Sequence, residues 1–149
     1  MKILVLHGPN LNLLGEREPH IYGHETLADI NKMIEAEAWK FGVELKFFQS
    51  NHEGTLIDRL HEERAWLDAI IMNPGALAHY SWSLRDAVAA IGKTMIEVHL
   101  TDLTQREEFR HHTVFEGLPN VRIIMGRGPQ GYINALRLLA DAGPMTPAA

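Results

Sequence analysis

The chain has 149 residues, of which 46% are hydrophobic, and a formal net charge of −5 at pH 7. This length fits one domain that can bury a core without a disulfide or a metal. The acidic balance argues against a nucleic-acid partner, and the lack of cysteine excludes disulfides, cysteine metal sites and a thiol nucleophile. No apolar run approaches the roughly 20 residues of a membrane span. The N-terminus has no signal-peptide pattern, so we expect a cytoplasmic protein that does not bind a membrane.

Short apolar runs alternate with segments of helical periodicity along the chain. In chain order, these patterns predict a strand at 2–6, a helix at 26–41, strand 43–48, helix 55–66, strand 69–72, helix 82–91, strand 94–98, a helical turn at 106–109, strand 121–125 and helix 130–142. Because the strands are apolar throughout, they are typical of a parallel sheet covered on both faces. The sequence therefore predicts a single α/β domain over 1–142, a flavodoxin-like doubly wound five-stranded parallel sheet, followed by a frayed tail at 143–149.

A polar segment, HGPNLNLLGEREPHIYG at residues 7–23, follows the first predicted strand. It is too polar and too interrupted by glycine and proline to predict a strand or a helix. In doubly wound folds, ligands bind beyond the carboxyl ends of the strands. Gly15 and Gly23 can act as the hinges of a lid over such a site. Within this segment, Tyr22 is a candidate general base activated by Arg17, because a guanidinium stabilises a phenolate. The alternative is a surface loop whose tyrosine packs on the domain.

Other strand ends also carry polar residues. Asn73 follows the third predicted strand, and Glu97 and His99 close the fourth. Each alone is more often a turn or rim residue, but this fold brings the ends of neighbouring strands to one rim. We expect amides and imidazoles to gather there. A phospho-receiver would need an aspartate where Asn73 stands, and a flavodoxin would need a Ser/Thr-rich phosphate loop after the first strand, so both are excluded. The nine histidines show no metal-ligand spacing.

Five segments of the chain resemble those of one known family. The segments HGPNLNLLGEREPHIYG, SNHEGTLIDRLHE, IIMNPGALAHYSWSLRDA, IEVHL and REEFRHHT are similar to the type II 3-dehydroquinate dehydratases, and the resemblance covers nearly the whole chain. It implies dehydration of 3-dehydroquinate to 3-dehydroshikimate, in the shikimate pathway of aromatic amino acid biosynthesis or in quinate catabolism. It further implies neither a metal nor an organic cofactor, and a homododecamer built as a tetramer of trimers.

The resemblance also implies roles for individual residues. Tyr22 is the implied base, activated by Arg17, and it forms an enolate that is stabilised through a water that Asn10 helps to hold. His99 is the implied general acid, with Glu97 beside it. The remaining implied positions are the substrate-binding Asn73, His79 and Arg110, the main-chain amides of Leu100 and Thr101, Asp86, which reaches the site of a neighbouring subunit, and Arg106 near the lid.

The chain departs from the family pattern at a few positions. Asp102 stands where the family has a neutral amide, which places a negative charge near the expected carboxylate pocket. Tyr80 and Trp82 replace smaller residues close to His79. These departures motivate an alternative function, a related lyase acting on a different cyclic hydroxy-acid. A catalytically silent binding protein is the other alternative.

Overall fold

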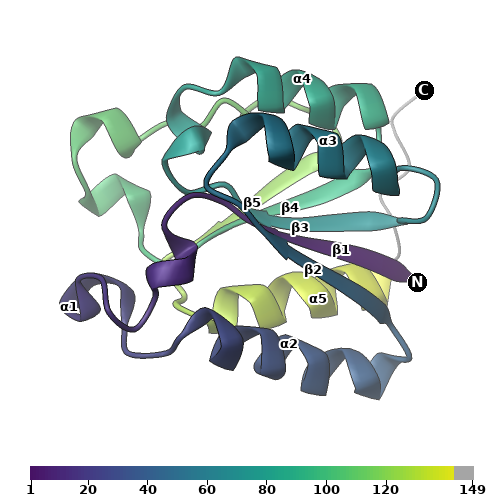
Figure 1. Ribbon diagram of the computed structural model, residues 1–149, viewed down its shortest axis with the longest axis horizontal. Coiled ribbons are helices and arrows are strands. Elements are labelled where there is room, and N and C mark those ends of the chain that lie inside the picture. Colours follow the sequence, from purple (N-terminus) through teal and green to yellow (C-terminus); the bar gives the residue numbers. More distant parts are fainter. Residues whose placement is uncertain (143–149) are drawn as a thin grey trace.

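Five parallel strands form one sheet in the computed structural model, which describes residues 1–142. The sheet order is β2-β1-β3-β4-β5, and α3 and α4 cover one face while α2 and α5 cover the other (Figure 1). The elements are β1 (Lys2–His7), η1 (Leu11–Leu13), α1 (Pro19–Tyr22), α2 (Leu27–Phe41), β2 (Glu44–Gln49), α3 (Glu53–Glu63), β3 (Ala69–Asn73), η2 (Gly75–His79), α4 (Trp82–Ile91), β4 (Thr94–His99), η3 (Leu103–Gln105), η4 (Glu108–Arg110), β5 (Val121–Met125) and α5 (Gln130–Ala142). The predicted flavodoxin-like fold is confirmed, while the predicted tail at 143–149 lies outside the described residues.

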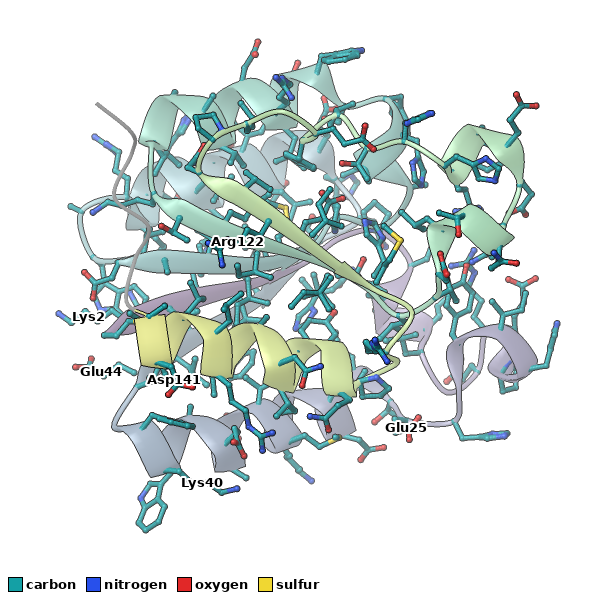
Figure 2. All side chains as sticks on the ribbon, turned by 180° about the vertical axis from the view of Figure 1, so that it is seen from behind. Lys2, Glu25, Lys40, Glu44, Arg122 and Asp141 are labelled. Carbon is teal, nitrogen blue, oxygen red and sulfur yellow. The ribbon has the colours of Figure 1, made fainter. Side chains whose placement is uncertain are left out.

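The apolar core is divided by the sheet into two clusters. Alternate residues of a strand point to opposite faces, so Ile3 and Val5 of β1 pack under α2 and α5, whereas Leu4 and Leu6 pack under α3 and α4. Both faces of the strand are therefore buried, which explains its continuous apolar run. Charged side chains project outward from the covering helices, as Lys40 and Asp141 do in Figure 2.

Local signals fix the ends of the helices. Thr26 caps α2 by accepting a hydrogen bond from the Asp29 amide at 3.1 Å, and the Asp29 carboxylate accepts one from the Thr26 amide at 3.0 Å. Gly42, with a φ of 64°, ends the same helix after Phe41, where the predicted helix also ends. No helix within the described residues is long and apolar enough to cross a membrane.

Two predicted connections differ in the structure. The polar segment 7–23 was expected to contain no helix, but it forms η1 and the one-turn α1, which Pro19 begins and Gly23, with a φ of 90°, ends. The helical turn predicted at 106–109 is found slightly later, as η4, and a second turn, η3, precedes it with Arg106 extended between the two. Asp102 caps η3, because its carboxylate accepts from the Thr104 amide at 3.0 Å.

Candidate active site

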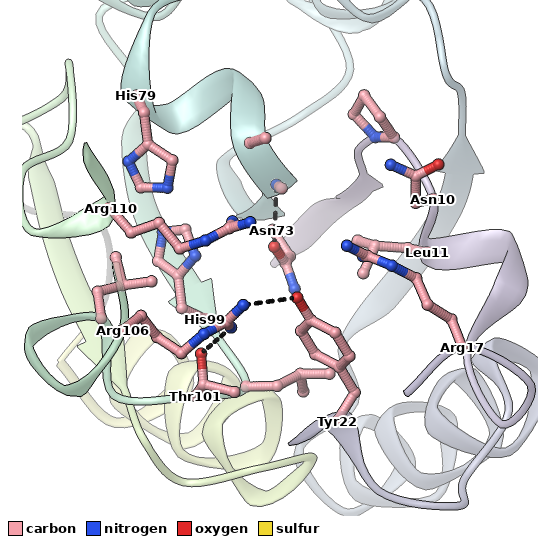
Figure 3. Close-up of a pocket in the computed structure, with 15 residues that line it drawn as sticks. Asn10, Leu11, Arg17, Tyr22, Asn73, His79, His99, Thr101, Arg106 and Arg110 are labelled. Atoms are coloured by element: carbon pink, nitrogen blue, oxygen red, sulfur yellow. Dashed lines mark hydrogen bonds between the residues drawn. The ribbon is translucent and has the colours of Figure 1, made fainter. Parts of the chain in front are cut away.

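One pocket lies beyond the carboxyl ends of β1, β3 and β4 and is shown in Figure 3. The sheet topology therefore gathers the polar strand ends at one rim, as the sequence predicted. The predicted site residues that line the pocket are Asn10, Arg17, Tyr22, Asn73, His79, His99, Leu100, Thr101, Arg106 and Arg110. Three of them are arginines and none is an acid, so the pocket suits an anionic ligand.

Tyr22 stands at the end of α1 between two guanidinium groups. The Arg17 guanidinium carbon lies 4.8 Å from the centre of the tyrosine ring, and that of Arg106 lies 5.4 Å away. The predicted proximity of Arg17 and Tyr22 is therefore present. The hydrogen bond to the tyrosine hydroxyl, however, comes from Arg106, which donates at 3.2 Å and also donates to the Thr101 hydroxyl at 3.1 Å. The family resemblance implies only that Arg106 lies near the lid, and it does not predict the hydrogen bond from Arg106 to Tyr22.

The Tyr22 ring also packs against the apolar cluster under α2 and α5. The expected lid and the alternative of a tyrosine that packs on the domain are thus not exclusive. The Tyr22 ring anchors the segment to the core, and the Tyr22 hydroxyl reaches the pocket (Figure 3). Gly15 and Gly23, the predicted hinges, both have a φ of 90°, a conformation that favours glycine.

The buried carboxylate of Glu97 contacts the imidazole of His99. Nε2 of His99 lies 2.6 Å from Oε1 of Glu97, and the Glu97 side chain has no exposed surface. Its second oxygen, Oε2, accepts a hydrogen bond from the Thr113 hydroxyl at 3.0 Å. Both oxygens of the Glu97 carboxylate are therefore engaged, one with the His99 ring and one with Thr113, which fixes the orientation of the imidazole.

His79 contributes a second imidazole to the pocket. Its Nδ1 donates to the carbonyl oxygen of His112 at 2.8 Å, which leaves Nε2 as an acceptor. Burial lowers the pKa of His79, and the nearby charges of His99 and Arg110 lower it further. The His79 ring stacks on that of His99 with 6.3 Å between ring centres. A neutral His79 can therefore accept a hydrogen bond from a ligand hydroxyl.

Two asparagines line the pocket at the strand ends. Asn10 lies in the loop after β1, and Asn73 is the last residue of β3. Asn73 is buried, and its Oδ1 accepts from the Gly75 amide at 3.1 Å, which directs its amide nitrogen away from that turn. Asn10 has a φ of 68°, in the left-handed region. The main-chain amide of Asn10 donates to Oδ1 of Asn51 at 3.0 Å, and the Gln49 side chain donates to the same oxygen at 3.1 Å. The segment SNHEGT thus supports the backbone of Asn10.

His7, the first residue of the polar segment at 7–23, does not line the pocket. It is completely buried beneath the pocket, where Nε2 lies 2.8 Å from Oδ1 of Asn31 and Nδ1 lies 3.3 Å from the Tyr132 hydroxyl. Burial lowers the pKa of His7 to about 4, so this side chain is neutral near pH 7. His7 is part of the support for the site and not of its lining.

Four other singled-out residues lie outside the pocket lining. Asp102 is exposed, and its carboxylate caps η3 and does not line the pocket. Tyr80 and Trp82 are also exposed and do not line the pocket. Asp86 is exposed on α4; its expected role concerns a neighbouring subunit and stays a prediction. Within residues 1–142, no group of three or more His, Asp or Glu side chains is placed to hold a metal ion.

Comparisons with known proteins agree with one another. Residues 1–140 match the family described as Dehydroquinase class II. The chain is 51% identical to a 3-dehydroquinate dehydratase of Desulforudis audaxviator, over 95% of this chain and 93% of the relative. It is 48% identical to the catabolic 3-dehydroquinase 2 of Aspergillus terreus, over 91% of each chain. The crystal structure of a type II dehydroquinase from Butyrivibrio crossotus superposes with a TM-score of 0.90 at 45% identity, covering 93% of this chain and 97% of that one.

Proposed function

Because the chain belongs to the class II dehydroquinase family, we propose that it removes water from 3-dehydroquinate by a stepwise trans elimination with Tyr22 as the base and His99 as the acid. The family and its relatives make the chain a hydro-lyase. The observation that supports these two roles is that the Tyr22 hydroxyl, held by Arg106, and the His99 ring, held by buried Glu97, line one pocket.

Tyr22 starts the reaction as a phenolate. The guanidinium groups of Arg106 and Arg17 stabilise the negative oxygen, Arg106 through a hydrogen bond and Arg17 over the ring face. The phenolate takes a proton from the carbon next to the ketone, and the electrons of that C–H bond move to the ketone oxygen. The resulting enolate needs donors aimed at its oxygen, and a water held by Asn10 supplies one.

His99 completes the reaction. When the enolate collapses, its electrons form the carbon–carbon double bond and the C–O bond to the hydroxyl breaks. His99 gives its proton to the departing hydroxyl, which leaves as water. Glu97 stabilises the protonated imidazole before this step, and the proton held by Tyr22 returns to solvent and then to His99. No electrons are lost, so the step requires no redox partner.

The substrate is an anion with several hydroxyls, and the remaining lining residues suit it. Neutral His79 accepts from one hydroxyl, and Asn73 and Arg110 bind others. The main-chain amides of Leu100 and Thr101 receive the carboxylate, close to the positive charge of Arg106.

We also propose a homododecamer in the cytoplasm as the working form. Tyr80, Trp82 and Phe109 have between 60% and 65% of their surface exposed in the single chain, which favours burial against other copies. The lack of cysteine is consistent with a reducing compartment.

The test follows the absorbance of the conjugated enone in the ultraviolet as purified protein acts on 3-dehydroquinate. Tyr22→Phe keeps the ring between its guanidinium partners and removes the base, so kcat should fall by about 100-fold or more while substrate still binds. Trp39→Phe is the control, because Trp39 is exposed on α2 and does not line the pocket, and it should retain wild-type kcat.

Three results would separate the alternatives. No turnover by the wild type at millimolar substrate would overturn the dehydratase function and favour a silent binding protein. Near-normal turnover by Tyr22→Phe would remove tyrosine as the base. Weak turnover of 3-dehydroquinate beside rapid turnover of another cyclic hydroxy-acid would favour the related lyase, although Tyr80, Trp82 and Asp102 lie outside the lining that selects the substrate in this chain.

A further inference from the structure

A buried threonine lies behind the acid pair of the pocket. Thr113 belongs to the segment REEFRHHT, whose last residue has no role in the reaction as proposed above, and it does not line the pocket. Its hydroxyl lies 3.0 Å from Oε2 of Glu97, and both side chains are buried. Thr113 is thus connected to the reacting centre through Glu97 and His99.

The direction of these hydrogen bonds is determined by their partners. The Phe115 amide donates to the Thr113 hydroxyl at 3.2 Å, so a lone pair of that oxygen is occupied and its proton is free to point to Glu97. The Thr113 amide donates to Oε1 of Glu116 at 3.1 Å, which fixes the backbone at the same residue. The threonine is therefore held as a donor to the carboxylate.

Loss of this donor would leave one oxygen of Glu97 buried without a partner. A buried, ionised oxygen without a hydrogen bond is strongly unfavourable. The carboxylate would then rotate, or it would take the proton that His99 holds. Either change weakens His99 as an acid without touching the substrate-binding residues.

We propose that Thr113 is a positioning residue for the general acid, which keeps Glu97 oriented and ionised so that His99 retains its proton until the C–O bond breaks. This inference rests on the proposed function, because it assumes that His99 protonates the leaving hydroxyl. It assigns to Thr113 an effect on the second chemical step only. Formation of the enolate by Tyr22 should proceed as in the wild type.

The experiment measures how often the enolate returns to 3-dehydroquinate and how often it loses its hydroxyl to form product. The reaction is run in D₂O, and NMR compares deuterium entry into unreacted 3-dehydroquinate with formation of product. Thr113→Val should lower kcat about tenfold, the loss expected when one hydrogen bond to a charged group is removed, with little change in KM. The ratio of exchange to product should rise severalfold, because an enolate that cannot expel its hydroxyl returns to substrate. Thr113→Ser keeps the hydroxyl and should restore both values.

Ser81→Ala is the matched control. The Ser81 hydroxyl is also buried, donates to the carboxylate of Glu53 and accepts from the Leu84 amide, but it lies outside the pocket lining. This variant should lose stability and keep the wild-type exchange ratio. Thermal unfolding of each variant confirms folding, and Thr113→Ala replaces Thr113→Val if the valine variant does not fold.

Two outcomes would overturn the role of Thr113. A wild-type kcat in the variants without the hydroxyl would show that the donor is dispensable, and a lowered kcat with an unchanged exchange ratio would show only a structural effect. A wild type that forms no product from 3-dehydroquinate would instead refute the proposed function itself, so the two failures are distinguishable.

Discussion

Acid should destabilise this protein through His7, at a pH where its carboxylates are still ionised. In the folded chain Nε2 of His7 donates to Asn31, and Nδ1 faces the Tyr132 hydroxyl. Burial raises the pKa of Tyr132 well above its ordinary value, so the phenol keeps its proton and donates it to Nδ1. A protonated His7 would bring a buried charge and a second donor to that contact. The folded state therefore excludes the proton that the unfolded state accepts.

The sign and size of the effect follow from linkage. The pKa of His7 is about 4 in the folded chain against the ordinary value of 6.5. Above pH 6.5 His7 is neutral in both the folded and the unfolded state, so it does not make the free energy of unfolding depend on pH. As the pH falls from 6.5 to 4, the unfolded state binds more protons, so the free energy of unfolding decreases by about 3 kcal/mol. The lowered carboxylate pKa values of Asp29, Glu37 and Glu107 act in the same direction, but only from about pH 4.5 downward, where the unfolded carboxylates take up protons.

The assay is urea unfolding, followed by tryptophan fluorescence at fixed protein concentration from pH 7.5 to pH 4. His7→Gln keeps an amide donor but cannot bind a proton, so the wild type should lose more stability than the variant by about 3 kcal/mol across this range. The lowered pKa of His79 acts in the same direction, but it is present in both proteins and cancels in the comparison. Equal losses in the two proteins would refute the reasoning.

Three further predictions concern the pocket and use the ultraviolet assay. Arg106→Ala should lower kcat near neutral pH by about tenfold or more, because it removes the charged donor to the Tyr22 hydroxyl; an unchanged kcat would contradict this. Asp102→Asn should leave KM within about twofold, since an exposed capping charge is screened by solvent. Asn51→Ala should lower kcat severalfold by releasing the Asn10 amide, whereas Asn51→Asp keeps the acceptor and should match the wild type.

The fold could be predicted because its signals are local. Capping by Thr26 and termination by Gly42 are determined within a few residues of each site, and the predicted bounds of α4 and α5 match the structure. The one-turn α1 has no periodicity to detect over four residues. It depends on the fixed φ of Pro19 and the positive φ of Gly23.

The candidate site was predictable where topology alone brings residues together, as at the ends of β1, β3 and β4. The contact between Tyr22 and Arg106 joins positions 84 residues apart, one at the end of the one-turn α1 and the other between η3 and η4, and no sequence period encodes it. The placement of His7 could have been found, because it continues the alternation of Ile3 and Val5 and so points under α2 and α5.

The same alternation places the proposed acid and base on different sides of the sheet. Ile96 and Val98 of β4 pack under α2 and α5, so Glu97 and His99 project to the opposite face, one behind the other. Tyr22 enters the pocket from the α2 and α5 side, where its ring joins the apolar cluster. A ligand seated between them at the rim has the Tyr22 hydroxyl on one side and the His99 ring on the other. The proposed trans elimination needs this geometry, which follows from the parity of two strand residues and from the packing of the Tyr22 ring.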